Sequence, residues 1–295
     1  MDRPVLFNGR LSKDKIDTWL NLLIENSESC SMDRSLAKAF LQLPESITFV
    51  SSIEDNIVGG TSIYRDRTRL SMVLTSVGVI EKFREAATYQ IIKSSLPFFK
   101  TVAIRDVDAL FPLDNKKKSL AFPFSLELDS WVEDVIKRLG FSLEGFLNHY
   151  SFKIHNNGGE RSLGWIKEHN MNQVSELIWE QSKPMGLTNS LVWVSRDFAA
   201  SRKCLMIALH EERVVAVAGF WKLPDKLCVS PILINPTLVS WKLVAESLVS
   251  EAQRNGLKFI ELPLIGDGQG DLISELEDHC STSAHRRLSL YRKPL

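Results

Sequence analysis

Hydrophobic and polar residues follow one order along this chain, and that order occurs twice. Apolar positions spaced three and four residues apart in Lys13–Glu25 predict an amphipathic helix, and alternating or continuous apolar runs predict strands. The succession of strand, turn, strand, strand, helix and strand then recurs at an offset of 157 positions, which places Lys82–Leu96 on Val239–Gln253 and Val102–Ile104 on Phe259–Glu261. This period exceeds that of solenoid repeats. We therefore predict two copies of one domain.

Each copy is expected to combine helices with a sheet, so the predicted fold class is α/β, with an α+β mixed sheet in each half. The apolar run Leu70–Val79 predicts a strand buried on both faces, and Gly140 is expected to end a helix as its C-cap. The elements expected in the first copy are helices at Lys13–Glu25, Met32–Leu43, Glu81–Leu96 and Trp131–Leu139, and strands at Ile47–Ile53, Ile57–Tyr64, Leu70–Val79, Thr101–Val107 and Phe141–Ile154.

The second copy is expected to repeat these elements after a boundary rich in Asn, Gly and charge. The segment HNNGGE at His155–Glu160 lacks apolar residues and is typical of a linker. We predict domains at 1–154 and 163–295, joined by a linker at 155–162. The second set comprises helices at Asn172–Gln181, Ser195–Ala200, Thr237–Asn255 and Leu272–His279, and strands at Cys204–Leu209, Arg213–Trp221, Leu227–Leu233, Lys258–Leu264 and Arg287–Arg292.

Composition narrows the class of protein. Hydrophobic residues make up 44% and charged residues 24% of the 295 residues, which is typical of a soluble globular protein. Lys plus Arg and Asp plus Glu both number 36, so we expect no nucleic-acid surface, and Lys116–Lys118 is interpreted as a solvated loop. No apolar stretch is long enough for a membrane span, and the N-terminus lacks a signal peptide, so we expect a cytoplasmic protein. With no CxxC pair and no HExxH motif, we expect no metal.

Three stretches of the first copy resemble the GCN5-related N-acetyltransferases. Glu54–Gly60 is similar to the hairpin of that family, in which a polar turn precedes an apolar pair and glycine. Val77–Arg84 resembles the fourth strand as it enters the acyl-CoA loop, and Ile136–Phe141 resembles the helix that ends in Leu-Gly-Phe. The resemblance covers most of residues 1–154 and reaches the second copy through the internal repeat. It implies two tandem domains of this fold, the second more degenerate.

The resemblance implies that acetyl-CoA or another acyl-CoA is the co-substrate. A helix N-terminus offers unpaired N–H groups to the pyrophosphate, and small side chains let the phosphate approach the backbone. Ala87 stands where the loop of the family has its first glycine, whereas Tyr89 replaces the second. The alternative is an ordinary core helix with a degenerate loop. The implied cofactor-binding residues are Val77, Val79, Arg84, Glu85, Ala86, Ala87 and Thr88.

Acyl transfer to an amine also needs a group that removes a proton, usually a carboxylate. Asp108 and Glu81 follow the two expected neighbouring strands, so the resemblance implies that either is the catalytic base. The alternative for each is a solvated loop or helix-start carboxylate. The tyrosine that the family places four residues before the glycine of Leu-Gly-Phe is replaced by Ile136, which counts against ordinary acetyl transfer.

The second copy departs further from the family. Its loop, Ile234–Ser240, has neither glycine nor arginine, although Thr237 and Ser240 offer hydroxyls, and we favour an ordinary capped helix there. The glycine-rich Gly266–Gly270 follows a strand and precedes a short helix, and we favour a flexible connector over a ligand loop.

The leading functional hypothesis is acyl-CoA-dependent N-acyl transfer to a small amine or a peptide amine, with the coenzyme in the first copy. One alternative is a non-catalytic protein of this fold that binds a metabolite or a protein partner. A second is an acyltransferase that uses the second copy, and a third is an aminoacyl-tRNA-dependent transferase. The neutral net charge counts against the third, because tRNA binding needs a basic face. The oligomeric state stays open.

Overall fold

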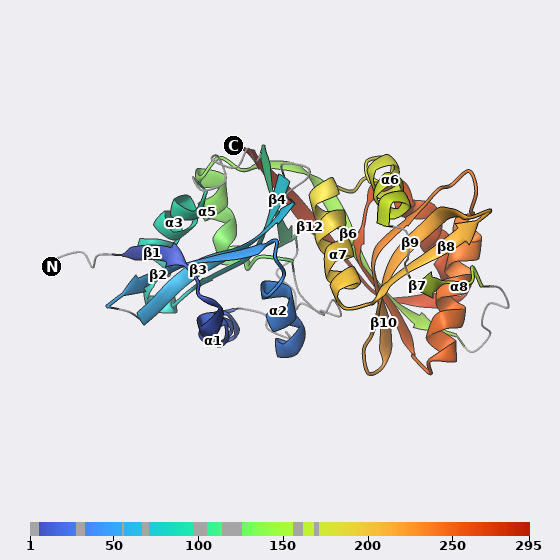
Figure 1. Cartoon of the computed structure of the whole chain (residues 1–295), viewed down its shortest axis with the longest axis horizontal. Helices are drawn as coiled ribbons and strands as arrows, with labels where there is room; N and C mark the ends of the chain where they lie inside the picture. Colours follow the sequence, from blue (N-terminus) through green and yellow to red (C-terminus); the bar gives the residue numbers. More distant parts are fainter. Residues whose placement is uncertain are drawn as a thin grey trace. The chain divides into compact units, whose positions relative to one another are not determined.

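The computed structural model of the chain describes residues 6–27, 33–54, 56–66, 71–96, 105–113, 126–155, 162–167 and 171–295. Each half of the chain shows one succession of elements, shown in Figure 1. The tandem repeat and the mixed α/β class predicted from the sequence are therefore confirmed. Lys116–Lys118, Thr101–Ile104 and most of the predicted linker lie outside the described residues.

The first half contains helices on both faces of its strands. The short strand β1 was not predicted, and the 3₁₀ turns η1 to η3 lie at the starts of predicted helices. Strand β5 runs from Asp106 to Pro112, later than the predicted Thr101–Val107. The helices are η1 (Lys13–Lys15), α1 (Ile16–Asn26), α2 (Arg34–Leu41), η2 (Glu81–Phe83), α3 (Arg84–Ser95), η3 (Ser130–Val132) and α5 (Glu133–Arg138), and the strands are β1 (Phe7–Arg10), β2 (Ser46–Ile53), β3 (Asn56–Asp66), β4 (Ser71–Val79), β5 (Asp106–Pro112) and β6 (Ser142–Ile154). Gly140, with a φ of +89°, follows α5 as predicted.

The second half repeats this order with a longer final strand than expected. Its helices are α6 (Met171–Gln181), α7 (Asn189–Ser201), α8 (Trp241–Arg254), η4 (Asp267–Gln269) and α9 (Gly270–Glu277). Its strands are β7 (Ile166–Lys167), β8 (Leu205–His210), β9 (Arg213–Lys222), β10 (Lys226–Ile234), β11 (Phe259–Ile265) and β12 (Cys280–Pro294).

The offset between the copies is not constant. It is 157 positions between the starts of α3 and α8, Arg84 and Trp241, but 153 between the starts of β5 and β11, Asp106 and Phe259. The predicted alignment of Val102–Ile104 with Phe259–Glu261 was therefore wrong. The ungapped alignment missed this shift because the connection from α3 to β5 is longer than that from α8 to β11.

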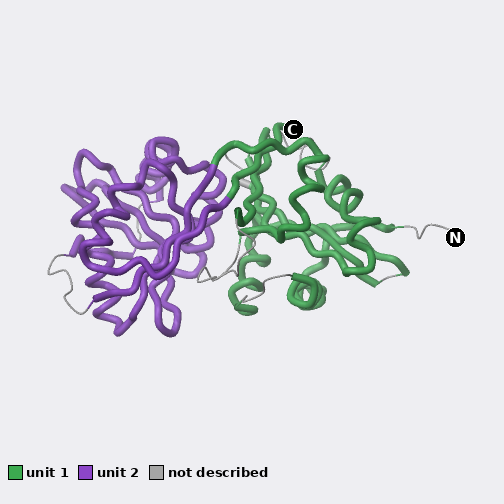
Figure 2. The backbone as a smooth tube through the Cα atoms, turned by 180° about the vertical axis from the view of Figure 1, so that it is seen from behind, with its two compact units in different colours: residues 1–145, 289–295 green, residues 146–288 purple. Residues whose placement is uncertain are grey.

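The chain divides into two compact units, coloured separately in Figure 2. Unit 1 comprises Met1–Gly145 and Ser289–Leu295, and unit 2 comprises Phe146–Leu288. This division differs from the predicted boundary after Ile154. Both β6 and β12 cross the division without a break, so unit 1 contains the last residues of the chain, while unit 2 contains most of β6.

The sheet of unit 1 has the strand order β1-β2-β3-β4-β5-β12. Only the last part of β12, Ser289–Pro294, belongs to this unit. Strands β1 to β4 are antiparallel, and β4 and β5 are parallel. Helices α1 and α2 cover one face, and α3 and α5 cover the other (Figure 1). The core beneath α3 and α5 includes Val77, Val79, Ile91, Phe111 and Tyr291.

The glycines of the predicted hairpin motif serve packing in unit 1. A Cβ atom on Gly60 would lie 2.4 Å from the carbonyl oxygen of Phe49 and 3.1 Å from the Trp19 ring, and one on Gly78 would crowd Trp19 from the next strand. Trp19 is fully buried, and its Nε1 donates a 2.9 Å hydrogen bond to Ser62 Oγ. Glycine is therefore needed where the indole of α1 lies against the sheet.

Unit 2 repeats these layers around its own sheet. The strand order is β6-β11-β10-β9-β8-β7, with β10 and β11 parallel. Helices α6 and α7 pack on β9 and β10, and α8 packs on β11 and α9. No described helix of either unit is long and apolar enough to cross a membrane.

Candidate active site

In unit 1 the parallel strands β4 and β5 separate after three residue pairs. Pairing runs from Ser71 with Asp106 to Val73 with Asp108, and no further pairing of these strands occurs among the described residues. Beyond this point β4 has a bulge at Thr75, where its register with β3 shifts. The β5-facing edge of β4 therefore opens towards Val79. An extended ligand can hydrogen-bond to such an edge as an added strand does.

A segment before α5 lies in part of this opening. Leu128 N donates a 2.8 Å hydrogen bond to Leu110 O of β5. Directly before β5, Arg105 O accepts from Leu295 N, which follows β12, and successive carbonyls of an extended chain point to opposite edges. Leu110 is five residues further along, so its carbonyl faces the β4 side. Leu128 is 1% exposed, and it narrows the opening from the β5 side.

The start of α3 has the features expected of an anion-binding loop. Its N-cap residue, Phe83, makes no side-chain capping bond, although the preceding turn η2 runs into the helix and Arg84 N donates to Glu81 O. Glu85 and Ala86 are exposed, whereas Ala87 and Thr88 are buried. Of the predicted loop residues, only Glu85 and Ala86 therefore present their side chains to solvent at this helix start.

Arg84 is fixed at this helix start by groups that the sequence did not identify. Its Nη2 donates a 2.5 Å hydrogen bond to Asn26 O at the end of α1, and its guanidinium lies 4.7 Å from the centroid of the Trp131 ring. The Asn26 side chain accepts a 3.2 Å hydrogen bond from Glu81 N. Asn26 and Trp131 are far from the loop in sequence, and no local pattern marks them.

The residues around Arg84 fit a group that is rich in acceptor oxygens. Arg84 Nε is buried and has no hydrogen-bond partner among the described residues. Arg84 N is already bonded to Glu81 O, so the helix start adds the later N–H groups of its first turn and the positive end of a dipole. The pyrophosphate of an acyl-CoA supplies acceptors of this kind, while the exposed Glu85 opposes it.

Val77 and Val79 face the core rather than the opening. Their side chains are 5% and 0% exposed and pack in a cluster with Ala87, Leu128 and Val132. Any contact between these two valines and a ligand would thus be made by the backbone of β4. Ala87 lies in the same cluster, so its small side chain serves packing as well as the loop.

The two predicted catalytic carboxylates lie in unlike surroundings. Asp108 is 1% exposed and lies where β4 and β5 still pair. Its oxygens accept from Arg292 Nε at 2.8 Å and from Arg292 Nη2 at 3.3 Å. Glu81, at the end of β4, is exposed. Asp108 is thus held in a buried ion pair, and only Glu81 is accessible to solvent beside the helix start.

A second cluster joins β12 to α5 in unit 1. Tyr291 OH donates a 2.6 Å hydrogen bond to Glu133 Oε1, and Lys137 Nζ lies 2.9 Å from the same oxygen. Burial acts to raise the pKa of Glu133, but the hydrogen bonds from Tyr291 and Lys137 outweigh it and lower the pKa. This cluster was not predicted from the sequence, because Tyr291 was assigned to the second domain.

In unit 2 the loop before α8 satisfies its own polar groups. Asn235 Oδ1 accepts from Thr237 N at 3.1 Å and from Thr237 Oγ1 at 2.7 Å. Ser240 is the N-cap of α8, and its Oγ accepts a 3.3 Å hydrogen bond from Leu243 N. The capped helix favoured from the sequence is confirmed, and both hydroxyls are used within the loop.

The glycine-rich loop of unit 2 is a close-packed structural element. A Cβ atom on Gly266 would lie 2.1 Å from Met185 O, and one on Gly268 would lie 2.2 Å from Pro184 O. Glycine is needed because two backbones approach each other here. The expectation of a flexible connector was wrong, since spacing alone does not reveal the segment against which a loop packs.

Gln269 bridges the ends of β10 and β11 in unit 2. These strands also pair over three residues only, from Lys226 with Phe259 to Cys228 with Glu261. Gln269 is fully buried, its Nε2 donates to Ile232 O at 2.8 Å, and its Oε1 accepts from Gly266 N at 3.0 Å. A backbone carbonyl that would face a ligand in the opening is therefore already satisfied.

Glu261 of unit 2 stands at the position that Asp108 occupies in unit 1. It is fully buried, and its oxygens lie 2.7 Å from His149 Nε2 and 3.1 Å from Lys226 Nζ. Arg286 Nη2 lies 2.9 Å from His149 Nδ1. Because arginine only donates, Nδ1 of His149 is the acceptor of this hydrogen bond. Both units thus place a buried, paired carboxylate at the third residue of this strand.

We expect unit 2 to lose stability in acid partly through Glu261. Burial acts to raise the pKa of Glu261, but the hydrogen bond from His149 and the charge of Lys226 outweigh it and lower the pKa. The ionised Glu261 then contributes its full stabilisation above about pH 4.3, the pKa of a glutamate in the unfolded chain. This stabilisation is lost as the pH falls through the lower pKa of the folded state. Thermal unfolding of Glu261→Gln should depend less on pH across this range than that of the native chain. Parallel pH profiles would contradict this.

Comparison with solved structures identifies the fold. A tandem protein of the GCN5-related N-acetyltransferase type from the clavulanic acid biosynthesis pathway matches with a TM-score of 0.62 at 10% identity, over 98% of each chain. A GCN5-related N-acetyltransferase from Sphaerobacter thermophilus matches with a TM-score of 0.59 at 9% identity, over 98% of this chain and 95% of the other. One from Kribbella flavida matches with a TM-score of 0.60 at 12% identity, over 99% and 71%.

No family model matches the sequence, and no curated protein matches it either. The similarity is therefore one of fold. The chain has the GCN5-related N-acetyltransferase fold in tandem, as the three sequence stretches implied.

Proposed function

We propose that the protein is an acyl-CoA-dependent N-acyltransferase that acts on a small amine or a peptide amine, with unit 1 as the coenzyme-binding unit. The observation that carries the proposal is the start of α3, where an uncapped helix end and Arg84 lie beside the opening between β4 and β5. The fold shared with solved N-acetyltransferases supports acyl transfer in general. An acyl-CoA supplies an activated thioester.

In this proposal each residue of unit 1 has a specific role. The first N–H groups of α3, together with Arg84, bind the pyrophosphate. The free edge of β4 near Val77 and Val79 orients the extended arm of the coenzyme through backbone groups. Glu81 is the accessible carboxylate that takes the proton of the amine. Asp108 is proposed to hold β12 in place through Arg292 rather than to act as the base.

The proposal extends to location and partners. We propose a cytoplasmic protein whose acceptor is an amine and which has no nucleic-acid partner, supported by the equal numbers of acidic and basic residues. A non-catalytic protein of this fold is the second candidate. It is favoured by Gln269, which occupies the opening of unit 2.

Acetyl-CoA should stabilise the protein, and Ala86→Glu should abolish that effect. Ligand at a hundred times its dissociation constant contributes about 2.7 kcal/mol, which is visible as a rise in melting temperature. Ala86 is exposed in the first turn of α3, so a glutamate there repels phosphate without disturbing the core. A carboxylate near a helix N-terminus also does not destabilise the helix.

Ala86→Gln is the matched control, because it adds nearly the same volume without the charge. It should retain most of the shift. Glu85→Gln should increase the shift, since it removes a negative charge beside the same site. If acetyl-CoA at millimolar concentration does not change the melting temperature of the native chain, acyl-CoA binding is disproved and the non-catalytic candidate is favoured.

A further inference from the structure

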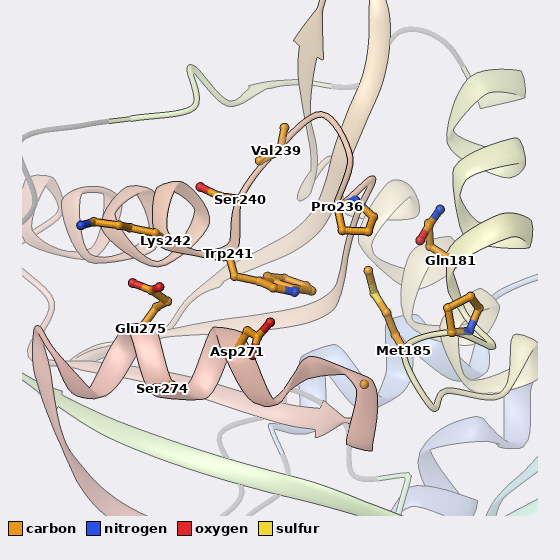
Figure 3. A pocket seen from close by; sticks show the side chains of 12 residues that line it. Gln181, Met185, Pro236, Val239, Ser240, Trp241, Lys242, Asp271, Ser274 and Glu275 are labelled. Atoms are coloured by element: carbon orange, nitrogen blue, oxygen red, sulfur yellow. The ribbon is translucent and has the colours of Figure 1, made fainter.

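Unit 2 contains a pocket of about 490 Å³ between the start of α8 and α9, shown in Figure 3. This volume lies within the range of small-molecule sites. Its apolar wall includes Trp241, Met185 and Pro236. In Figure 3 the Trp241 ring projects into the pocket between Asp271 and Pro236, while Lys242 and Glu275 lie together at one end.

The walls of this pocket are held in place by the close packing described above. The Gly266–Gly270 loop contacts the backbone of Pro184 and Met185, and Ser240 caps α8. Trp241 and Met185 are buried, so their positions do not depend on a ligand. A pocket that exists before binding loses little free energy in ordering its walls.

The charged side chains that line the pocket have no partner in the part of the chain that the structure describes. Among the residues that the structure describes, Lys242, Asp271 and Glu275 form no ion pair and no side-chain hydrogen bond. Asp271 and Glu275 are four residues apart on α9, so both face the same side of the helix.

This arrangement disfavours a phosphate ligand. Two carboxylates outnumber the single lysine, and the N–H groups of Thr237, Leu238 and Val239 already bond to Asn235. The opening between β10 and β11 is bridged by Gln269. The charged side chains that line the pocket therefore carry a net negative charge, which opposes a coenzyme pyrophosphate.

We propose that this pocket binds an organic ammonium ion with an apolar body. Asp271 and Glu275 pair with the ammonium group, and the indole of Trp241 adds a cation–π contact. The apolar body packs against Met185 and Pro236. This binding site is separate from the acyl-CoA site proposed in unit 1 and does not depend on catalysis.

Titration calorimetry of the full chain with phenethylammonium, in the absence of acyl-CoA, tests the proposal. Asp271→Asn and Glu275→Gln should each weaken binding about tenfold or more, because each removes a charge-assisted hydrogen bond. Lys242→Gln should strengthen binding by roughly threefold, because it removes a like charge. All three residues line the pocket and pair with no described residue, so the variants should fold as the native chain does.

The direction of these changes separates an ammonium site from an anion site. If coenzyme A binds here instead, Lys242→Gln weakens its binding and the two carboxylate variants strengthen it. That pattern, or the absence of phenethylammonium binding at about 10 mM, overturns the proposal. Equal affinity for phenethylammonium in the native chain and the three variants also overturns the proposal. The Ala86→Glu variant of unit 1 should bind phenethylammonium normally, so failure of either proposal can be recognised without the other.

Discussion

Removal of Ser289–Leu295 is expected to unfold unit 1 and to leave unit 2 folded. The deletion removes the buried Tyr291 and its hydrogen bond to Glu133, and it leaves Asp108 buried without Arg292. Loss of a buried aromatic side chain costs about 3–5 kcal/mol, and an unpaired buried charge costs a similar amount. Together these exceed the lower part of the roughly 5–15 kcal/mol that stabilises a typical domain.

Hydrogen exchange measured by mass spectrometry distinguishes the two units. Protection should be lost across β2 to β4 and kept across β9 to β11. A chain that lacks only Pro294 and Leu295 is the control, because it keeps Tyr291 and Arg292. It loses the packing of the partly buried Leu295 and the 2.8 Å bond from Leu295 N to Arg105 O, which is worth about 1 kcal/mol. If protection is lost in unit 2 instead, the last strand belongs with the second domain, as the sequence suggested.

The sequence predicted most helices and strands because each has a clear apolar period. Tandem symmetry followed from the same periods, and the fold followed from three short stretches. The boundary was not predictable in this way. Asn and Gly at His155–Glu160 mark a loop, but they do not reveal that β6 and β12 each contribute to both units.

The candidate site was predictable only where it is local in sequence. The start of α3 was recognised because Arg84–Thr88 are consecutive. Asn26 and Trp131, which hold Arg84, are distant in the chain. Asp108 was placed at the end of a strand because the strand was assigned to Thr101–Val107, whereas β5 begins at Asp106. A shift of a few residues moved this carboxylate from an open end to the paired part of the sheet.

Asp108→Asn should therefore reduce stability, whereas Glu81→Gln should reduce turnover. Asparagine at position 108 leaves Arg292 without its buried counter-charge, and we expect the free energy of unfolding to fall by about 2–4 kcal/mol. This loss is smaller than is usual when a buried ion pair is broken, because the Arg292 side chain is 28% exposed and also lies 3.4 Å from Glu144. Glu81 is exposed, so Glu81→Gln should change stability by less than about 0.5 kcal/mol.

Denaturant unfolding and acetyl-CoA turnover, measured on both variants, separate structural from catalytic roles. If Glu81 is the base, Glu81→Gln lowers turnover by roughly 10²–10⁴ with an unchanged unfolding midpoint. The double variant Asp108→Asn with Arg292→Met should recover part of the stability lost in Asp108→Asn, because an apolar side chain leaves no uncompensated charge. If Asp108→Asn instead keeps full stability and loses turnover, Asp108 is the base, and its pairing with Arg292 orients the carboxylate for proton transfer rather than holding β12 in unit 1.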